Sequence, residues 1–228
     1  MKLLGLDTST DACSVALAVD AKVDLRHVVE ARAHTRVLMP MIRELLESHG
    51  LRAADLDAIV LGGGPGSFIG VRIATSVAQG LAFAAGLKVA VVSSLEVIAA
   101  EAFATTRAST VIVTQDARMH EVYLGQYERG PGDSPLPLGE TVLHSVDEPL
   151  EWPEGTGIAR AGGGWHRYPS LTVELAGGAE LLAELRYPRA DHLLRCGLAK
   201  VSAGDLIAPE DVVPAYVRSK VASVPTRS

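Results

Sequence analysis

Short apolar runs, separated by a few turn residues, open the chain and predict three strands over residues 2–7, 13–19 and 23–31. Connections this short favour an antiparallel meander, because neighbouring strands can pair directly across a tight turn. The spacing of apolar residues then changes. Apolar side chains recur every three or four residues over residues 36–49, as on one face of a helix. Pro40 lies inside this span, and a proline fits a helix only in its first turn or at a bend.

A run of glycines follows the next apolar segment and separates a predicted strand from a predicted helix. The strand covers residues 58–61, the glycine-rich turn residues 62–66, and the helix residues 71–85. A strand over residues 89–92 and a helix over residues 95–105 complete the first half. The order βββαβαβα is similar to that of one domain of the actin, sugar kinase and Hsp70-like ATPase architecture.

The second half of the chain has a weaker pattern, which predicts two paired strands, a long loop and a final helix. The strands cover residues 111–116 and 121–127, and the glycine- and proline-rich residues 129–139 read as a surface loop. An amphipathic helix is predicted over residues 190–201. Its inward side chains are predicted to be Leu193, Leu194, Leu198 and Val201.

These elements predict an α/β protein of two lobes with mixed sheets flanked by helices. We place the boundary so that residues 1–107 form an N-terminal lobe and residues 108–228 form a smaller C-terminal lobe. The polar residues from 219 onward are expected to be a disordered tail. A chain of 228 residues is long enough for one large domain or two small ones.

The composition supports a substantial core but gives no basis for nucleic-acid binding by the chain alone. Hydrophobic residues make up 48% of the chain, and the formal net charge is −6. Phosphate neutralisation needs clustered lysine and arginine, and no long basic run is present. Asp7 interrupts the first apolar run too early for a signal peptide, and no apolar stretch approaches the ~20 residues of a membrane span. We expect a cytoplasmic protein without membrane contact, with Cys13 and Cys196 as buried thiols.

The glycine-rich turn and a polar turn after the first strand form a candidate nucleotide-like site. A strand, a glycine turn and a helix N-terminus bring backbone N–H groups to one point, which favours anions. The acidic residue after the first strand has two alternative roles: it could face a bound cation, or it could cap its own turn through hydrogen bonds. The residues concerned are Asp7, Thr8, Ser9, Gly64, Gly66 and Ser67.

Seven segments, which run almost from end to end and in order, carry a resemblance to a known family. They are GLDTST (5–10), AHTRVLMP (33–40), GPGSFIGVRI (64–73), QGLA (79–82), DARMHEVY (116–123), GGW (163–165) and PAYVR (214–218). With these segments the chain resembles the TsaB (YeaZ) family, the non-catalytic subunit of the bacterial tRNA threonylcarbamoyladenosine machinery. Two positions depart from the family pattern: Ile69 replaces a usual threonine, and His120 a usual small residue.

The resemblance implies an actin-like, ribonuclease H-like ATPase (ASKHA) fold and a subunit that is not itself an enzyme. It implies pairing with the catalytic paralogue TsaD and cooperation with the ATPase TsaE, with tRNA reached indirectly through the complex. The assembly transfers a threonylcarbamoyl group to the adenosine beside the anticodon in tRNAs that read codons beginning with A. No cofactor is expected, and the capping role of Asp7 is favoured. A homodimer stays open as the state of the chain without the paralogue.

Residues with almost no side chain recur every four positions along the helix after the glycine turn. Such a ridge permits close approach along the i±4n rows of a helix. Its partner could be the protein's own sheet or preceding helix, or another protein, since the resemblance implies that the first two helices meet those of the paralogue. The candidate interface residues are Met41, Leu45, His49, Gly70, Ala74, Val77, Ala78, Leu81 and Ala82.

Two enzymatic alternatives are weighed against this scaffold role. An ATP-dependent phosphotransferase or nucleotide-binding protein of the same fold would use a second glycine motif at residues 162–164 and Asp116 as the catalytic carboxylate. A metalloprotease would need His-Glu-x-x-His, but Leu124 stands in place of the second histidine after His120, and the segment also reads as a strand, where this spacing does not pair two ligands. The resemblance also places Ser94 and Ile98 where the paralogue has its metal-binding histidine pair, so no metal site is expected.

Overall fold

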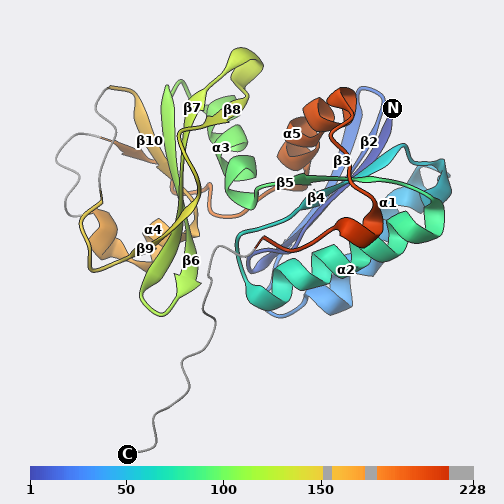
Figure 1. The fold of residues 1–228 in the computed structure, drawn as a ribbon, viewed down its shortest axis with the longest axis horizontal. Helices are drawn as coiled ribbons and strands as arrows, with labels where there is room; N and C mark the ends of the chain where they lie inside the picture. Colours follow the sequence, from blue (N-terminus) through green and yellow to red (C-terminus); the bar gives the residue numbers. More distant parts are fainter. Residues whose placement is uncertain (151–155, 173–178, 216–228) are drawn as a thin grey trace, which may run out of the picture.

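Two mixed sheets, with helices between and around them, make up the computed structural model, which describes residues 1–150, 156–172 and 179–215 (Figure 1). The first sheet has the strand order β3-β2-β1-β4-β5. Its strands are β1 (Lys2–Asp7), β2 (Ala12–Val19), β3 (Lys22–Val29), β4 (Ala58–Gly62) and β5 (Val89–Val92). The α/β fold class with two mixed sheets, of the actin-like and ribonuclease H-like kind, is thus confirmed.

The first sheet combines the predicted antiparallel meander with a parallel half. Strand β1 pairs antiparallel with β2, so that Leu4 lies opposite Leu17, and parallel with β4, so that Leu4 lies opposite Ile59. Strand β4 in turn pairs parallel with β5. Parallel neighbours need crossover helices, which the chain supplies. The carboxyl ends of β1 and β4 therefore meet at one edge, where the polar turn and the glycine turn begin.

The second sheet has the order β11-β10-β6-β7-β8, with β9 also paired to β7. Its centre is the antiparallel pair β6 and β7, in which Val113 lies opposite Gly125. Strand β10 extends it in parallel with β6. The strands are β6 (Thr110–Arg118), β7 (Glu121–Arg129), β8 (Pro135–Pro137), β9 (Val142–Ser145), β10 (Ile158–Ala161) and β11 (Glu180–Leu181).

Helices cover both faces of the first sheet. The helices within the described residues are α1 (His34–Ser48), α2 (Phe68–Ala85), α3 (Ser94–Thr105), α4 (Gly163–Arg167) and α5 (Ala190–Ala203). The same part of the chain contains short 3-10 helices at Ala53–Asp55, Pro131–Asp133, Pro169–Thr172 and Pro209–Asp211. Helices α1 and α2 pack on the face that carries Leu4 and Leu6, and α5 packs on the opposite face with Leu3 and Val60. Alternate side chains of β1 thus enter two separate apolar layers.

Helices α3 and α5 lie next to each other in the middle of the molecule, between the two sheets (Figure 1). Helix α3 packs its Leu95, Ile98 and Phe103 on the second sheet, although it precedes residue 107. Helix α5 packs on the first sheet, although it belongs to the second half of the chain. Each sheet is therefore covered in part by a helix from the other side of residue 107, while the division into residues 1–107 and 108–228 stays a prediction.

Helix α1 begins two residues earlier than predicted, which places Pro40 beyond its first turn. A proline has no N–H to donate to the carbonyl four residues back, here that of Arg36. Both residues are exposed, so water can supply the missing hydrogen bond. Of the two predicted alternatives for Pro40, the first turn is therefore wrong, and a bend stays a prediction.

Two further expectations for the second half are wrong in detail. Leu198 points outward, with 46% of its surface exposed, and the inward place on α5 belongs to Gly197. A Cβ atom at Gly197 would collide with the side chain of Val60, so the helix approaches β4 more closely than a leucine there would allow. Residues 129–139 are not simply a loop, because they contain the turn Pro131–Asp133 and strand β8. The expected tail from residue 219 lies outside the described residues.

Helix α2 also corrects the expectation about apolar stretches. Its 18 residues are long and apolar enough, by length and composition alone, to cross a membrane. Core helices share this composition, and a third of the helix is buried inside this fold. The helix owes its start to Ser67, whose side chain accepts a hydrogen bond from the Gly70 N–H at 3.3 Å, and its end to Gly86 in the left-handed conformation.

Candidate functional site

Asp7 ends β1 as a buried carboxylate whose two oxygens are both used inside the protein. It is 1% exposed. Oδ1 accepts hydrogen bonds from the Ser9 N–H and the Ser9 hydroxyl, each at 2.7 Å, and Oδ2 accepts one from the Ser94 hydroxyl at 2.7 Å. Burial raises the pKa of Asp7, and these hydrogen bonds act in the opposite direction. The carboxylate therefore clamps its own turn to the start of α3.

The polar turn and the glycine turn are hydrogen-bonded to each other. The Thr8 hydroxyl donates to the Gly70 carbonyl at 2.6 Å, and the Ser67 N–H donates to the Ser9 carbonyl at 2.6 Å. A Cβ atom at Gly66 or Gly70 would collide with the carbonyl oxygens of Ser9 and Thr8. These two glycines thus serve close backbone packing between the turns.

The structure brings the predicted nucleotide-like residues together but gives them different surroundings. Asp7 and Thr8 are buried and take part only in hydrogen bonds within the protein. The Gly64 N–H donates to the Ser94 hydroxyl at 3.2 Å. Ser9, Gly66 and Ser67 line an open cavity. This geometry supports the turn-capping role of Asp7.

The small-residue ridge of α2 faces the first sheet, which contradicts its interpretation as a docking surface. Ala74, Ala78 and Ala82 are 0% exposed and belong to the core around β1 and β4. Gly70 is buried against Thr8. Small side chains here let the helix approach its own sheet, so the alternative of packing within the chain is the one observed.

The other predicted interface residues are also largely turned inward. Met41 and Leu45 of α1 are 7% and 0% exposed, and Val77 and Leu81 of α2 pack partly against the same core. The His49 imidazole lies 2.9 Å from the Asp24 carboxylate, which joins the end of α1 to β3. A periodic pattern of small and apolar residues reports a contact, but it cannot identify the partner.

A different set of side chains, which the sequence reading missed, forms the exposed apolar side of α2. Phe68, Ile69 and Phe83 are 53%, 68% and 78% exposed. The first two border a shallow hollow of about 350 Å³, and the Arg72 guanidinium stacks 3.3 Å from the centre of the Phe68 ring. Helix α1 lies beside α2 on the same side of the first sheet (Figure 1). The sequence contained one indication of this apolar side, because two of the only three phenylalanines in the chain lie in this helix.

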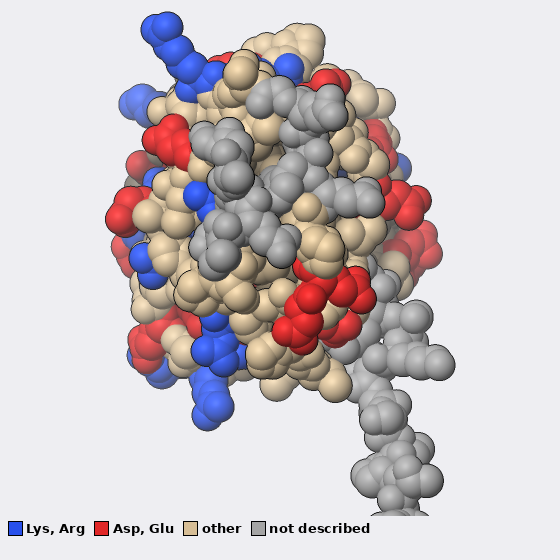
Figure 2. Space-filling view, turned by 90° about the vertical axis from the view of Figure 1, so that its left-hand side faces the viewer, with Lys and Arg blue, Asp and Glu red and all other residues tan. Residues whose placement is uncertain are grey.

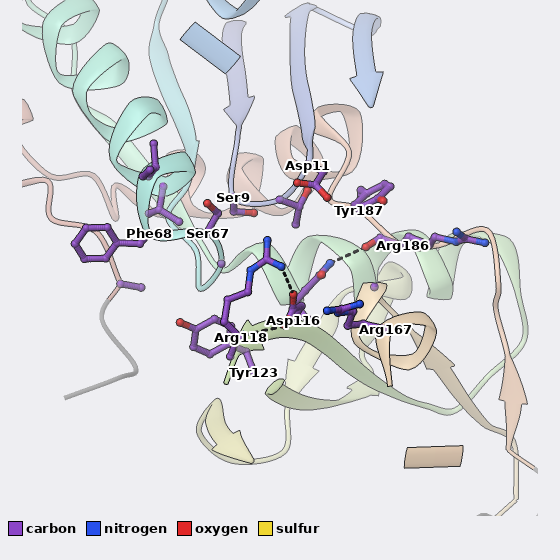
Figure 3. Close-up of a pocket in the computed structure, with 18 of the residues that line it drawn as sticks. Ser9, Asp11, Ser67, Phe68, Asp116, Arg118, Tyr123, Arg167, Arg186 and Tyr187 are labelled. Atoms are coloured by element: carbon purple, nitrogen blue, oxygen red, sulfur yellow. Dashed lines mark hydrogen bonds and ion pairs between the residues drawn. The ribbon is translucent and has the colours of Figure 1, made fainter. Parts of the chain in front are cut away.

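A cavity of about 820 Å³ opens between the two sheets, at the edge where β1 and β4 end. The polar turn after β1 and the start of α2 form one wall, and the end of β6, helix α4 and residues 186–187 form the other (Figure 3). Charged residues contributed by five separate segments line it. They are Asp11, Arg72, Asp116, Arg118, Arg167 and Arg186.

Asp116 holds this second wall together, so the structure does not leave it free as a catalytic carboxylate. Its oxygens accept hydrogen bonds from the Arg118 N–H at 2.8 Å and the Tyr168 hydroxyl at 3.0 Å, and they lie 3.0 Å from the Arg118 guanidinium. Gly162 and Gly164 pack against Thr114, where a Cβ atom would collide. The predicted second glycine motif therefore serves the tight passage from β10 into α4.

The structure also shows the surroundings of the two cysteines, and of Ser94 and Ile98, the two residues expected at the positions of the paralogue's metal-binding histidines. Cys13 and Cys196 are free thiols, and burial raises the pKa of each to about 12. Ser94 is the buried hydroxyl that donates to Asp7, and Ile98 belongs to the core under the second sheet. Among the described residues, no group of three or more His, Cys, Asp or Glu side chains is arranged to hold a metal ion.

Comparison with known proteins finds a family model and relatives whose descriptions all concern the same tRNA modification. A family model described as TsaD, tRNA N6-adenosine threonylcarbamoyltransferase, matches residues 28–172. The chain is 34% identical over 230 residues to the tRNA threonylcarbamoyladenosine biosynthesis protein TsaB of Escherichia coli K12, a match that covers 97% of this chain and 96% of that protein. The protein of the same name from Haemophilus influenzae is 34% identical over 229 residues, with 97% and 95% covered.

Solved structures agree with these relatives. YeaZ from Pseudomonas aeruginosa has a TM-score of 0.85 and 35% identity, over 94% of this chain and 99% of that one. A crystal structure described as an uncharacterized protein with similarity to peptidase YEAZ from Pseudomonas aeruginosa has a TM-score of 0.86 and 35% identity, over 95% and 99%. The architecture described above is therefore shared along nearly the whole length of both structures.

Proposed function

Because the chain belongs to the TsaB (YeaZ) family, we propose that it acts in tRNA threonylcarbamoyladenosine biosynthesis as a non-catalytic subunit that binds the catalytic paralogue TsaD. The observation that carries this proposal is the exposed apolar side of α2, formed by Phe68, Ile69 and Phe83. Exposed aromatic side chains on one helix face are typical of protein interfaces. The small-residue ridge behind them fixes α2 rigidly on its sheet, so the helix presents this side as a preformed surface.

The sealed turn after β1 supports a docking role over catalysis. The oxygens of Asp7 accept three internal hydrogen bonds, and its turn is bonded to the glycine turn. The alternative of an ATP-dependent phosphotransferase has less support, since Asp116 is likewise engaged by Arg118 and Tyr168.

Light scattering of the mixed purified proteins tests the docking surface. We expect the chain and TsaD to form a complex that Phe83→Glu weakens at least about tenfold, since a fully buried aromatic anchor contributes ~2 kcal/mol or more to an interface. Val142→Glu is the matched control, because Val142 is a similarly exposed apolar side chain on β9 in the other lobe. Equal loss with both variants, or unchanged binding with Phe83→Glu, would overturn the proposed surface.

Activity measurements test the role. We propose that the chain alone modifies no tRNA, and that modification appears when TsaD and the ATPase TsaE are added. We further propose that the same apolar side pairs two copies of the chain when TsaD is absent, which would bury Phe83. We also propose that the protein works in the cytoplasm, where the tRNA that the complex modifies is found. Turnover by the solitary chain would contradict the non-catalytic role.

A further inference from the structure

Strand β3 forms one edge of the first sheet. In the part of the chain that the structure describes, β3 pairs with β2 and with no other strand. It has eight residues, Lys22–Val29, and is therefore longer than the usual strand of about 5–6 residues. An edge strand presents a row of backbone N–H and C=O groups to which a strand of another chain can add.

The hairpin of β2 and β3 shows which backbone groups of β3 point outward. A turn of two residues, 20–21, joins the strands, so Lys22 beside the turn bonds to β2. Beyond the other end of β3, the Glu30 N–H donates to the Asp11 carbonyl at 3.2 Å, so even-numbered residues bond inward along the whole strand. The odd-numbered residues therefore direct their N–H and C=O groups away from β2. They are Val23, Leu25, His27 and Val29.

The outward side of β3 is open to solvent. The Leu25 carbonyl accepts a hydrogen bond from the Arg26 guanidinium at 3.0 Å, which agrees with its place outside the ladder with β2. A carbonyl oxygen can accept a second hydrogen bond. Val23 and Val29, at the two ends of the strand, are 47% and 53% exposed. Both the backbone and the apolar side chains of this edge can therefore be reached by another strand.

The side chains of β3 that face α1 alternate in charge, in the order Lys22, Asp24 and Arg26. The Asp24 carboxylate lies 2.9 Å from the His49 imidazole, and the Arg26 guanidinium lies 2.8 Å from the Glu44 carboxylate. Asp24 and Arg26 keep 54% and 37% of their side-chain surface exposed, so each can also contact an added strand. On the face shown in Figure 2, basic and acidic side chains are instead scattered among neutral ones.

This order of charges complements a second, antiparallel copy of the same strand. When Leu25 lies opposite Leu25 of the second copy, Asp24 of each copy lies opposite Arg26 of the other. In the same register Val23 lies opposite His27, and the outward backbone groups of these residues and of Leu25 meet in hydrogen-bonded pairs. The charged pairs then occupy the positions between these hydrogen-bonded pairs, where opposite side chains come closest.

The two neighbouring registers bring like charges together. A shift of two residues in one direction places Arg26 opposite Arg26, and a shift of two residues in the other direction places Asp24 opposite Asp24. Like charges directly opposite each other destabilise a pair of strands. The charges of β3 therefore select one register for pairing with itself.

We propose that β3 pairs antiparallel with β3 of a second copy of the chain, in the register that sets Asp24 against Arg26, and so joins two first sheets into one continuous sheet. This edge is separate from the docking side of α2, because α2 packs on β1 and β4 whereas β3 lies beyond β2. The pairing needs neither TsaD nor the exposed apolar side of α2.

Sedimentation equilibrium of the full chain, from about 5 to about 500 μM, tests the pairing by mass action. Every protein in the series carries Phe83→Glu, which removes the pairing proposed through α2, so the molar mass reports the β3 edge. We expect the molar mass to rise with concentration toward that of a dimer. Asp24→Arg and Arg26→Asp should each weaken the dimer at least about tenfold, because two attractive pairs become repulsive. Glu47→Arg, at an exposed residue of α1, is the matched control and should leave the dimer unchanged.

Mixing the two charge variants separates pairing from damage to the fold. The Asp24→Arg chain carries two positive charges at these positions, and the Arg26→Asp chain carries two negative ones. An equal mixture should therefore form a heterodimer although neither variant pairs alone. Both changes lie on a partly exposed edge, so circular dichroism of each variant should match that of the unmodified protein.

Hydrogen exchange locates the contact on the backbone. With rising concentration, exchange should slow at the amides of Val23, Leu25 and His27, which point outward, and stay unchanged at Asp24 and Arg26, which already bond to β2.

Three results would overturn the proposal. One is a chain that stays monomeric at about 500 μM, which would leave the edge to a strand of another protein. Another is a dimer that Asp24→Arg leaves intact or that Glu47→Arg weakens equally. The third is a mixture of the two charge variants that stays monomeric. Loss of binding to TsaD is read separately, from the α2 variants, and does not affect this test.

Discussion

Replacing Asp7 by alanine tests whether this carboxylate is a clamp or a retained functional group. The change removes the acceptor of three hydrogen bonds of 2.7 Å. Ser9 and Ser94 are 1% and 0% exposed, so two hydroxyls and one N–H would lose their partner away from water. Each buried unpaired donor costs ~1–3 kcal/mol, and relief from burying a charge offsets part of this. We expect a net loss of about 3 kcal/mol.

For a chain of this size, 3 kcal/mol corresponds to a fall of about 6–12 °C in the midpoint of thermal unfolding. Asp7→Asn keeps an oxygen for the two Ser9 donors and loses only the acceptor for Ser94, so it should cost ~1 kcal/mol. Urea unfolding followed by circular dichroism measures both. Asp11→Ala, at an exposed carboxylate in the same turn, should stay within ~0.5 kcal/mol. An Asp7→Ala protein as stable as the original, or more so, would show that Asp7 is kept for function at the expense of stability.

Two further changes probe the helices. Ala78→Asp places a charge at a position under the first sheet that is 0% exposed, so it should lower the free energy of unfolding by more than ~4 kcal/mol and prevent folding. Ser76→Asp, on the exposed side of α2, should leave the protein folded. Solubility and circular dichroism of the two variants test this difference. Burial raises the pKa of Glu101 from 4.5 to about 7, so its contribution to stability is complete below pH 4.5 and is lost as the pH rises to about 7. The loss in the free energy of unfolding, of up to about 3 kcal/mol, should largely disappear in Glu101→Gln, as measured by urea unfolding at a series of pH values. An unchanged pH profile in this variant would refute the contribution of Glu101.

The sequence predicted correctly those elements for which the spacing of apolar residues and the flanking turn residues indicate the same bounds. Strands Lys2–Asp7 and Val89–Val92 have the predicted bounds, and α2 ends at Ala85 as Gly86 indicated. The fold follows because a meander, a glycine turn and crossover helices leave few ways to build one sheet. Leu198 was misplaced because hydrophobicity ranked it above Gly197, while the close approach of α5 to Val60 needed the glycine.

The site was harder to predict because its parts come from distant segments. The turn-capping role of Asp7 could be anticipated from a short polar residue at the end of a strand. The excess of arginine in the cavity could not, because Arg72, Arg118, Arg167 and Arg186 lie in four separate segments of the chain with no basic run between them. The apolar side of α2 was overlooked for a related reason: the regular four-residue spacing of its small residues drew attention to the face that is buried.

The return of α5 to the first sheet has a consequence for synthesis on the ribosome. Leu3 and Val60 emerge early, but their cover, Leu193 and Leu194, is translated more than a hundred residues later. After α5 the chain continues along the same lobe, where Ile207 pairs with Val89 and the Ala215 N–H donates to the Gly63 carbonyl at 3.0 Å. The earliest-made strands must therefore wait, with one apolar face uncovered, while the second sheet forms. Nascent chains stopped before residue 190 should bind chaperones through that face.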